Sequence, residues 1–207
     1  MKIRFRKSVG IALTVYALSS EGFMTVGDVI EEFGSVSTDG IRWGIVDDRV
    51  MGGRSQGRFT LTKEATMLFE GDLSLENNGG FSSVRSSDVA YDFSDREGLV
   101  LRVRGDGRTY QMRLNTNARF RSWNVSFSAQ FETEKGKWMD VFLPFDQFKA
   151  GFRGRSLPSV AFDASKVRRL GILLGDKKPG SFRLEIDSIS TYGPEESVVA
   201  RTAEVGN

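Results

Sequence analysis

Carboxylates are the side chains of this sequence that could carry acid–base or metal chemistry, because it contains no histidine and no cysteine. Ser-His-Asp and Cys-His catalysis, thiolate metal sites and disulfides are therefore excluded within it. Two acids could still act as a glycosidase pair, but the spacing singles out no pair. We predict a protein that is not an enzyme and uses no cofactor or metal. The available acids are Asp47, Asp48, Glu70, Asp72, Asp106, Asp140 and Asp187.

Two glycine-rich segments, residues 43–55 and 69–85, concentrate turn-forming residues. Neither is a phosphate loop, because no Gly-Lys-Ser/Thr follows and no helical pattern opens behind the glycines. Paired glycines allow a positive φ or a close backbone approach, and aspartates there can accept backbone hydrogen bonds, with a calcium site as the alternative. We predict a structural clasp whose rim could bind a ligand. Its residues are Trp43, Asp47, Asp48, Met51, Gly52, Gly53, Ser55, Gly79, Gly80 and Phe81.

A third set of polar residues lies on three segments that alternate polar and apolar side chains, at 99–104, 110–115 and 123–130. If these segments are neighbouring strands, their polar sides form one surface. Arginine, amide and hydroxyl groups could there bind a sugar, a carboxylate or a protein through planar hydrogen bonds. The alternative is an ordinary solvated sheet face. The candidate face comprises Arg102, Arg104, Gln111, Arg113, Asn115, Asn124 and Ser126.

The elements that must position these residues are short strands. A period of two recurs along the chain, and 23 glycines against 4 prolines suit tight turns between strands. We predict an all-β fold, an antiparallel β-sandwich of jelly-roll type, with Trp123 and Trp138 in its core. Segments 143–150 and 163–169 are predicted to be briefly helical or turn-like. The predicted strands are 29–33, 58–62, 66–69, 81–86, 99–104, 109–115, 123–130, 138–144, 170–174 and 182–189.

Both ends of the chain differ in composition from its middle. Residues 1–20 have a basic start, about ten apolar residues and small residues at Ala17 and Ser19, which favours a signal peptide. The alternatives are an organelle transit segment, or a buried strand or helix at the domain edge. The apolar run is too short for a stable transmembrane anchor. One domain is predicted over 29–192, with a loose tail over 193–207.

Charge argues against nucleic acid as a partner. The sequence has 29 basic and 27 acidic residues. Four of the basic residues and none of the acids lie in residues 1–19, which leaves 25 basic against 27 acidic residues in the remainder. A nucleic-acid-binding protein would keep a basic excess there.

The order of the glycine-rich motifs resembles the complex I intermediate-associated protein 30 family. The resemblance covers roughly residues 29–192, and the Val-Met-Gly-Gly sequence at 50–53 is its most specific part. The other matching motifs are Trp43, residues 47–55, 69–71, 79–85, 105–110, 144–148, 153–154, 170–177 and 180–186.

This resemblance implies a galactose-binding-like β-sandwich and a non-enzymatic role as an assembly factor of respiratory NADH dehydrogenase (complex I). The expected partners are proteins, including subunits of that complex. The alternative function is an exported carbohydrate-binding module, which would expose aromatic residues such as Trp123 or Trp138. A signal peptide would place the protein in the periplasm or outside the cell, and otherwise it would be in an organelle or the cytoplasm.

Overall fold

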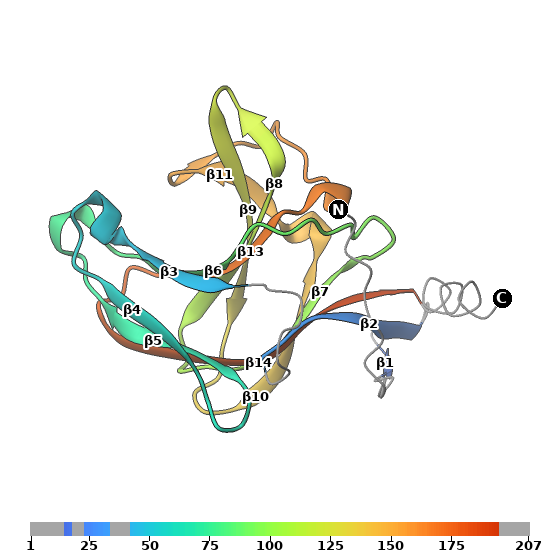
Figure 1. Cartoon of the computed structure of the whole chain (residues 1–207), viewed down its shortest axis with the longest axis horizontal. Coiled ribbons are helices and arrows are strands. Elements are labelled where there is room, and N and C mark those ends of the chain that lie inside the picture. Colours follow the sequence, from blue (N-terminus) through green and yellow to red (C-terminus); the bar gives the residue numbers. More distant parts are fainter. Residues whose placement is uncertain (1–14, 18–22, 34–41, 195–207) are drawn as a thin grey trace.

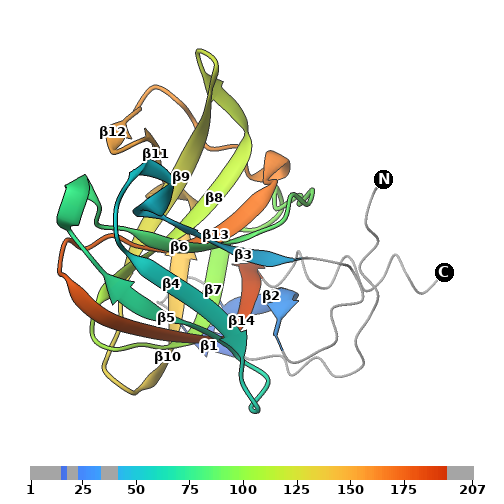
Figure 2. The ribbon, with the colours of Figure 1, turned by 60° about the vertical axis from the view of Figure 1, so that its left-hand side comes forward.

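The computed structural model describes residues 15–17, 23–33 and 42–194. Within these ranges, two antiparallel sheets of seven strands each pack face to face, as Figures 1 and 2 show from two sides. The predicted antiparallel β-sandwich is confirmed. Most predicted strands are present within a few residues of the predicted bounds, but β3 (Trp43–Asp47), which lies in the predicted clasp, and β11 and β12 were not predicted as strands.

Sheet A is built around one long strand, β14, which pairs with β5 along its first half and with β2 along its second half. Strand β7 pairs with its other edge, and β10 pairs with β7. The strands of sheet A are β1 (Val15–Ala17), β2 (Phe23–Glu32), β4 (Gln56–Leu61), β5 (Met67–Leu73), β7 (Gly98–Arg104), β10 (Trp138–Pro144) and β14 (Gly180–Pro194).

Sheet B has the strand order β12-β11-β9-β8-β13-β6-β3. Strand β13 therefore lies between β8 and β6, although these strands are far apart in the sequence. The hairpin of β8 and β9 extends above the rest of the sandwich in Figure 1. The strands of sheet B are β3 (Trp43–Asp47), β6 (Ser82–Ser86), β8 (Thr109–Phe120), β9 (Trp123–Glu132), β11 (Lys149–Phe152), β12 (Arg155–Ser156) and β13 (Arg169–Leu174).

The core lies between the sheets and follows the alternation that the sequence shows. In β8, Tyr110, Met112 and Leu114 are fully buried, and the residues between them face outward. Leu99 and Leu101 of β7 are also fully buried in this core. Because side chains alternate across a strand, each sheet keeps an outer face that is available for polar side chains.

Four short 3₁₀ helices occur in the described ranges: η1 (Asp48–Met51), η2 (Glu76–Asn78), η3 (Phe145–Gln147) and η4 (Ala164–Lys166). The last two confirm the brief helical turns predicted in segments 143–150 and 163–169. The first two lie in the two glycine-rich segments. No helix in the described part of the chain is long and apolar enough to cross a membrane.

The described sandwich extends beyond the predicted domain bounds at both ends, from β2 to the end of β14. Of the predicted leader, only Val15–Ala17 is described, and it pairs with β2 as an edge strand. This pairing is the edge-strand alternative for that segment, and cleavage of residues 1–20 stays a prediction. The predicted tail lies outside the described residues from 195 onward.

Candidate functional site

The clasp is organised by the carboxylate of Asp48, which is fully buried at the start of η1. It accepts hydrogen bonds from the Ser55 amide at 2.9 Å and the Ser55 hydroxyl at 2.5 Å. It also accepts one from the Gly80 amide at 2.6 Å and one from the Phe81 amide at 3.3 Å. One side chain therefore ties together the two glycine-rich segments that the sequence singled out.

The paired glycines show both predicted properties, a positive φ angle and a close approach to another group, but at different positions. Gly52 and Gly80 adopt positive φ angles of 89° and 115°, which favour glycine. Gly53 and Gly79 instead lie against the Asp48 side chain, and a Cβ atom at either position would overlap its carboxylate. The glycines thus make both the turn and the space that Asp48 occupies.

Asp48 is held ionised by its neighbours. Burial alone would raise its pKa, but the hydrogen bonds from Ser55, Gly80 and Phe81 outweigh burial and lower the pKa of this carboxyl. Asp47 points elsewhere and accepts hydrogen bonds from the Gly57 amide at 3.0 Å and the Ser82 hydroxyl at 2.6 Å. Both aspartates act as structural acceptors, and they do not converge on a common point.

Two apolar side chains stand at the rim of the clasp. Val50 is 71% exposed and Met51 is 59% exposed, and both belong to η1, whose first residue is the buried Asp48. Trp43, by contrast, packs against the core and lies 5.6 Å from the Phe33 ring. The rim thus presents apolar residues to solvent from a short helix whose first residue is fixed by hydrogen bonds.

The predicted candidate face is divided between the two sheets, which corrects the assumption that its three segments are neighbours. Arg102 and Arg104 lie on β7 in sheet A, whereas the other members lie on β8 and β9 in sheet B. Arg102 pairs with Asp140 at 3.3 Å and Arg104 with Glu185 at 2.7 Å. Both guanidinium groups also lie over the Trp138 ring.

The remaining five residues of the candidate face do share one surface, the outer face of sheet B. The register pairs Arg113 with Ser128 and Asn115 with Ser126. These side chains lie opposite the buried set of β8 and β9. The five are Gln111, Arg113, Asn115, Asn124 and Ser126.

The register brings further polar residues to this surface. Gly171 of β13 is the partner of both Arg113 of β8 and Arg85 of β6, and Ser128 of β9 pairs with Lys149 of β11. Sequence reasoning missed Arg85 and Lys149, because their positions depend on strand pairings that connect distant segments. The alternation within 81–86 was the only local signal for Arg85. We call Arg85, Gly171, Arg113, Ser128 and Lys149 the arginine row.

Two arginines of the row are partly withdrawn from water. Burial lowers the pKa of Arg113, and the charge of Arg85 lowers it further. Burial and the charge of Arg169 lower the pKa of Arg85. The Nε atom of Arg113 is buried and has no hydrogen-bond partner among the described residues, whereas Nε of Arg85 donates to the Ser83 hydroxyl at 3.1 Å.

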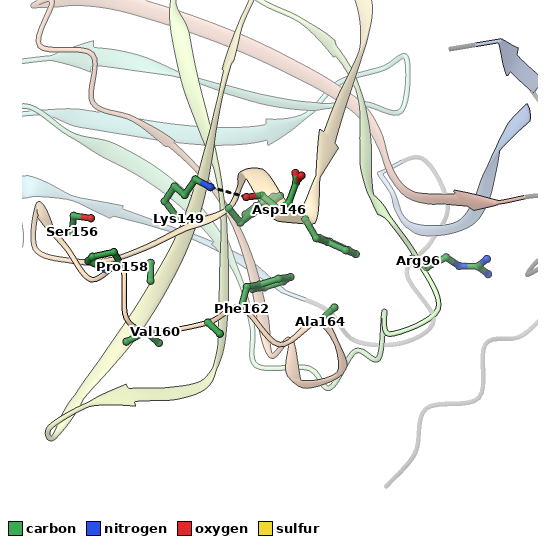
Figure 3. A pocket seen from close by; sticks show the side chains of 12 residues that line it. Arg96, Asp146, Lys149, Ser156, Pro158, Val160, Phe162 and Ala164 are labelled. Atoms are coloured by element: carbon green, nitrogen blue, oxygen red, sulfur yellow. Dashed lines mark hydrogen bonds between the residues drawn. The ribbon is translucent and has the colours of Figure 1, made fainter. Parts of the chain in front are cut away.

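A cavity of about 730 Å³ lies beside β11, as Figure 3 shows. Its apolar lining includes Phe145, Phe148 and Phe162, whose rings contact one another. Lys149 reaches its edge and donates a hydrogen bond to the Asp146 carbonyl at 2.8 Å. Arg96 and Asp146 also line the cavity, so its wall combines aromatic rings with charged side chains.

Trp123 is 49% exposed, so the expectation that it lies in the core was wrong. It begins β9 at the protruding hairpin, and its ring lies 5.0 Å from that of Phe152. The Arg153 guanidinium lies 5.5 Å from the Trp123 ring. Trp138 is half-buried on the outer face of sheet A. Each tryptophan is stacked with arginine rather than enclosed by the core.

Three buried polar atoms without hydrogen-bond partners in the described part of the chain belong to Glu31, Trp43 and Tyr91. Burial raises the pKa of Glu31, and the nearby indole N–H of Trp43, which is not in hydrogen-bond geometry, opposes this effect only in part. Burial and the nearby Glu31 raise the pKa of Tyr91. Burial thus shifts Glu31 toward its neutral form. No group of three or more acids that could hold a metal ion occurs among the described residues.

Comparison with known proteins adds a family match to this geometry. Residues 32–186, most of the sandwich, match the family model described as complex I intermediate-associated protein 30. A mouse protein named complex I intermediate-associated protein 30, mitochondrial, is 30% identical over an alignment of 173 positions, and the match covers 73% of this chain and 52% of the mouse protein. A Drosophila melanogaster protein of the same name is 28% identical over 74% of this chain and 59% of its own length. The chain therefore spans between half and three fifths of these relatives.

Solved structures with a similar fold include carbohydrate-binding modules. A family 11 module of the cellulase Lic26A-Cel5E from Clostridium thermocellum superposes with a TM-score of 0.60 over 80% of this chain and 94% of the module. The same kind of module, in complex with a mixed-linked tetrasaccharide, gives a TM-score of 0.59 over 80% of this chain and 95% of the module. Sequence identity is 13% in both cases, so the likeness shows the fold alone.

Proposed function

We propose, from the premise that this chain belongs to the complex I intermediate-associated protein 30 family, that it is a non-enzymatic module that binds assembly intermediates of a respiratory NADH dehydrogenase. The observation that carries the proposal is the family match over residues 32–186, which includes the clasp and both sheets. The relatives are named for association with complex I intermediates. Protein subunits are accordingly the partners that we propose.

The outer face of sheet B is the surface that we propose for this contact. It presents arginine, amide and hydroxyl groups over several neighbouring strands. Arginine is enriched at the energetically important centres of protein interfaces. The clasp rim, with Val50 and Met51 exposed, offers an apolar contact at the edge of the same sheet.

The site geometry supports binding rather than catalysis. Asp48 is saturated by hydrogen bonds, and Glu70 is held between Arg58 and Arg183. A general acid or base needs a titratable group within reach of its substrate, and these acids are already committed to the fold.

Localisation follows from the same proposal. The relatives carry the word mitochondrial in their names, and we propose that the chain acts where the NADH dehydrogenase of its own cell is assembled. An uncleaved or organelle-trimmed N-terminus fits this role, whereas removal of residues 1–19 as a signal peptide fits the exported alternative.

Affinity capture tests the function. The tagged full-length chain is purified from its own cells in mild detergent, and mass spectrometry identifies the captured proteins and the mature N-terminus. We expect enrichment of NADH dehydrogenase subunits over a tag-only control, and accumulation of partial complexes on native gels when the gene is deleted. Normal assembly in the deletion strain, with no subunit enriched, would reject the proposal.

One observation favours a second candidate, a carbohydrate-binding module. Trp123 is 49% exposed and lies beside the tilted Phe152 ring and the Arg153 guanidinium, so an aromatic surface is available to a sugar ring, and the fold is shared with such modules. Calorimetric titration with a mixed-linkage β-glucan oligosaccharide distinguishes the candidates. Binding that Trp123→Ala abolishes and Trp138→Ala preserves would establish the second candidate, and the absence of heat would eliminate it for this ligand class.

A further inference from the structure

We propose that the arginine row binds carboxylates of an extended acidic segment of a protein partner. This inference rests on the proposed protein-binding function and specifies the chemistry of the partner. It is carried by the charge imbalance of the outer face of sheet B, by the burial of Arg113, and by the spacing that Gly171 creates between two arginines.

On the outer face of sheet A, arginine side chains form ion pairs with carboxylates of the same chain. Glu70 is held between Arg58 and Arg183, at 2.9 and 3.0 Å. Arg104 is paired with Glu185 at 2.7 Å. The positive charges of that face are neutralised by the chain itself.

The arginine row lacks such compensation. No carboxylate of the described residues forms an ion pair with Arg85 or Arg113. Asp88 follows β6 in the sequence. Its carboxylate pairs instead with Arg168 at 2.6 Å and with Arg169 at 3.8 Å. The row therefore presents two guanidinium groups whose charge is available to a ligand.

Keeping Arg113 charged without a carboxylate partner destabilises the folded, ligand-free protein. Its Nε atom is buried without a partner, and burying an unpaired polar or charged group opposes folding. Arg85 adds like-charge repulsion, which disfavours the charged form of Arg113. A carboxylate placed between the two arginines would relieve the repulsion between them, because guanidinium groups bind carboxylates through charge-assisted hydrogen bonds.

The layout suits an extended segment better than a single small anion. Arg85 and Arg113 are two strands apart in the sheet, which corresponds to about 10 Å between their backbones. Gly171 lies between them and contributes no side chain. Alternate side chains of an extended peptide are roughly 7 Å apart, so successive outward carboxylates can reach both arginines. Ser128 and Lys149 continue the row with further donors.

Fluorescence anisotropy with a labelled hepta-glutamate peptide and the full-length chain tests the site. We expect saturable binding that a hepta-glutamine peptide does not show. The double variant Arg85→Gln/Arg113→Gln should weaken binding at least about tenfold, the scale of one lost charge-assisted contact. The Arg113→Lys variant should bind the peptide more tightly than the double variant but more weakly than the wild type, because lysine keeps the charge but lacks the planar guanidinium group.

The matched control is Arg58→Gln/Arg183→Gln, which removes the same charge from the outer face of sheet A. We expect a change of less than about twofold, since exposed charges distant from a site are screened by salt. Equal weakening by both double variants would show unspecific attraction and overturn the inference. Tight binding of inorganic phosphate without binding of the peptide would also overturn it.

Thermal unfolding separates a ligand site from a structural role. The Tm of free Arg113→Gln should equal or exceed that of the wild type, because the variant removes a partly buried cation that has no carboxylate partner among the described residues. The hepta-glutamate peptide should raise the Tm of the wild type only, since a ligand stabilises the state that it binds. A marked fall in Tm for both Arg113→Gln and Arg113→Lys would show that Arg113 is structural and refute the inference.

The two proposals can fail separately. If the wild type and the Arg85→Gln/Arg113→Gln variant capture NADH dehydrogenase subunits equally, the assembly role stands and the row is not its contact. If the peptide binds at the row but no subunit is captured, the acidic-ligand site stands and the assembly role falls.

Discussion

At the scale of single residues, Asp48 shows how a buried acid can be a structural necessity. Its carboxylate receives hydrogen bonds from both glycine-rich segments, and Gly53 and Gly79 leave the space that it fills. The charge remains ionised because the donors outweigh burial. The motif Asp-Asp-Arg-Val-Met-Gly-Gly is therefore an acid together with the glycines that accommodate it.

Removing the charge of Asp48 should destabilise the sandwich. We expect Asp48→Asn to lower the free energy of unfolding by about 3 kcal/mol, because an amide group placed among amide and hydroxyl donors leaves buried donors unpaired. Denaturant unfolding measures the change. Gly53→Ala should have a comparable effect through overlap with Asp48, while exposed Asp72→Asn should change stability by less than about 0.5 kcal/mol. Wild-type stability in both Asp48→Asn and Gly53→Ala would disprove the clasp.

At the scale of elements, one arginine ties the start of β8 to the loop before β14. Arg108 forms a buried ion pair with Asp176 at 2.7 Å and donates to the carbonyls of Lys178, Gly180 and Ser181. Burial would lower the pKa of Arg108, but the bond and charge of Asp176 raise it overall. The sequence motif at 105–108 thus fixes a connection between the two sheets.

Arg108→Gln should cost about 3–5 kcal/mol of unfolding free energy, because it leaves Asp176 as an unpaired, nearly buried charge. The matched control is Lys137→Gln, which breaks the exposed pair with Glu134 and should cost less than about 1 kcal/mol. Thermal and chemical unfolding of the two variants are compared under the same conditions. If the two losses are alike, the Arg108 connection does not hold the sheets together.

At the scale of the whole molecule, buried acids divide into two classes with opposite effects on stability. Hydrogen bonds and arginine partners outweigh burial and lower the pKa of Asp48, Asp176 and Glu185. Burial raises the pKa of Glu31. The folded protein therefore binds fewer protons than the unfolded chain at the first three acids and more at the fourth.

These shifts predict the pH dependence of stability. The contribution of the first three acids is present above their ordinary pKa values of 3.8 and 4.5 and is lost as pH falls through their lower folded values. Glu31 acts in reverse, so stability falls as pH rises from 4.5 to its raised folded pKa. We expect Glu31→Gln to be more stable than the wild type at neutral pH and to lose this advantage below pH 4.5. Unfolding curves across pH 3–8 would contradict this if the difference between the two proteins stayed constant.

The sequence by itself determined the features that depend on local order. Alternating side chains predicted most strands and their buried sides, because a strand places successive residues on opposite faces. The absence of histidine and cysteine limited the chemistry, and the glycine-rich motifs predicted both the clasp and the family. The buried residues of β8 and the turns at η3 and η4 were correctly predicted in this way.

Only the tertiary structure decided which strands are neighbours. The alternation in β7 and β8 looks alike, yet they lie in different sheets, because strand order depends on the packing of the whole chain. The same long-range pairing placed Gly171 between Arg85 and Arg113 and so assembled the arginine row. It also carried Trp123 to the end of a hairpin that projects past the core. Local periodicity gives the side of a strand on which a residue lies, and tertiary packing gives the surface to which that side belongs.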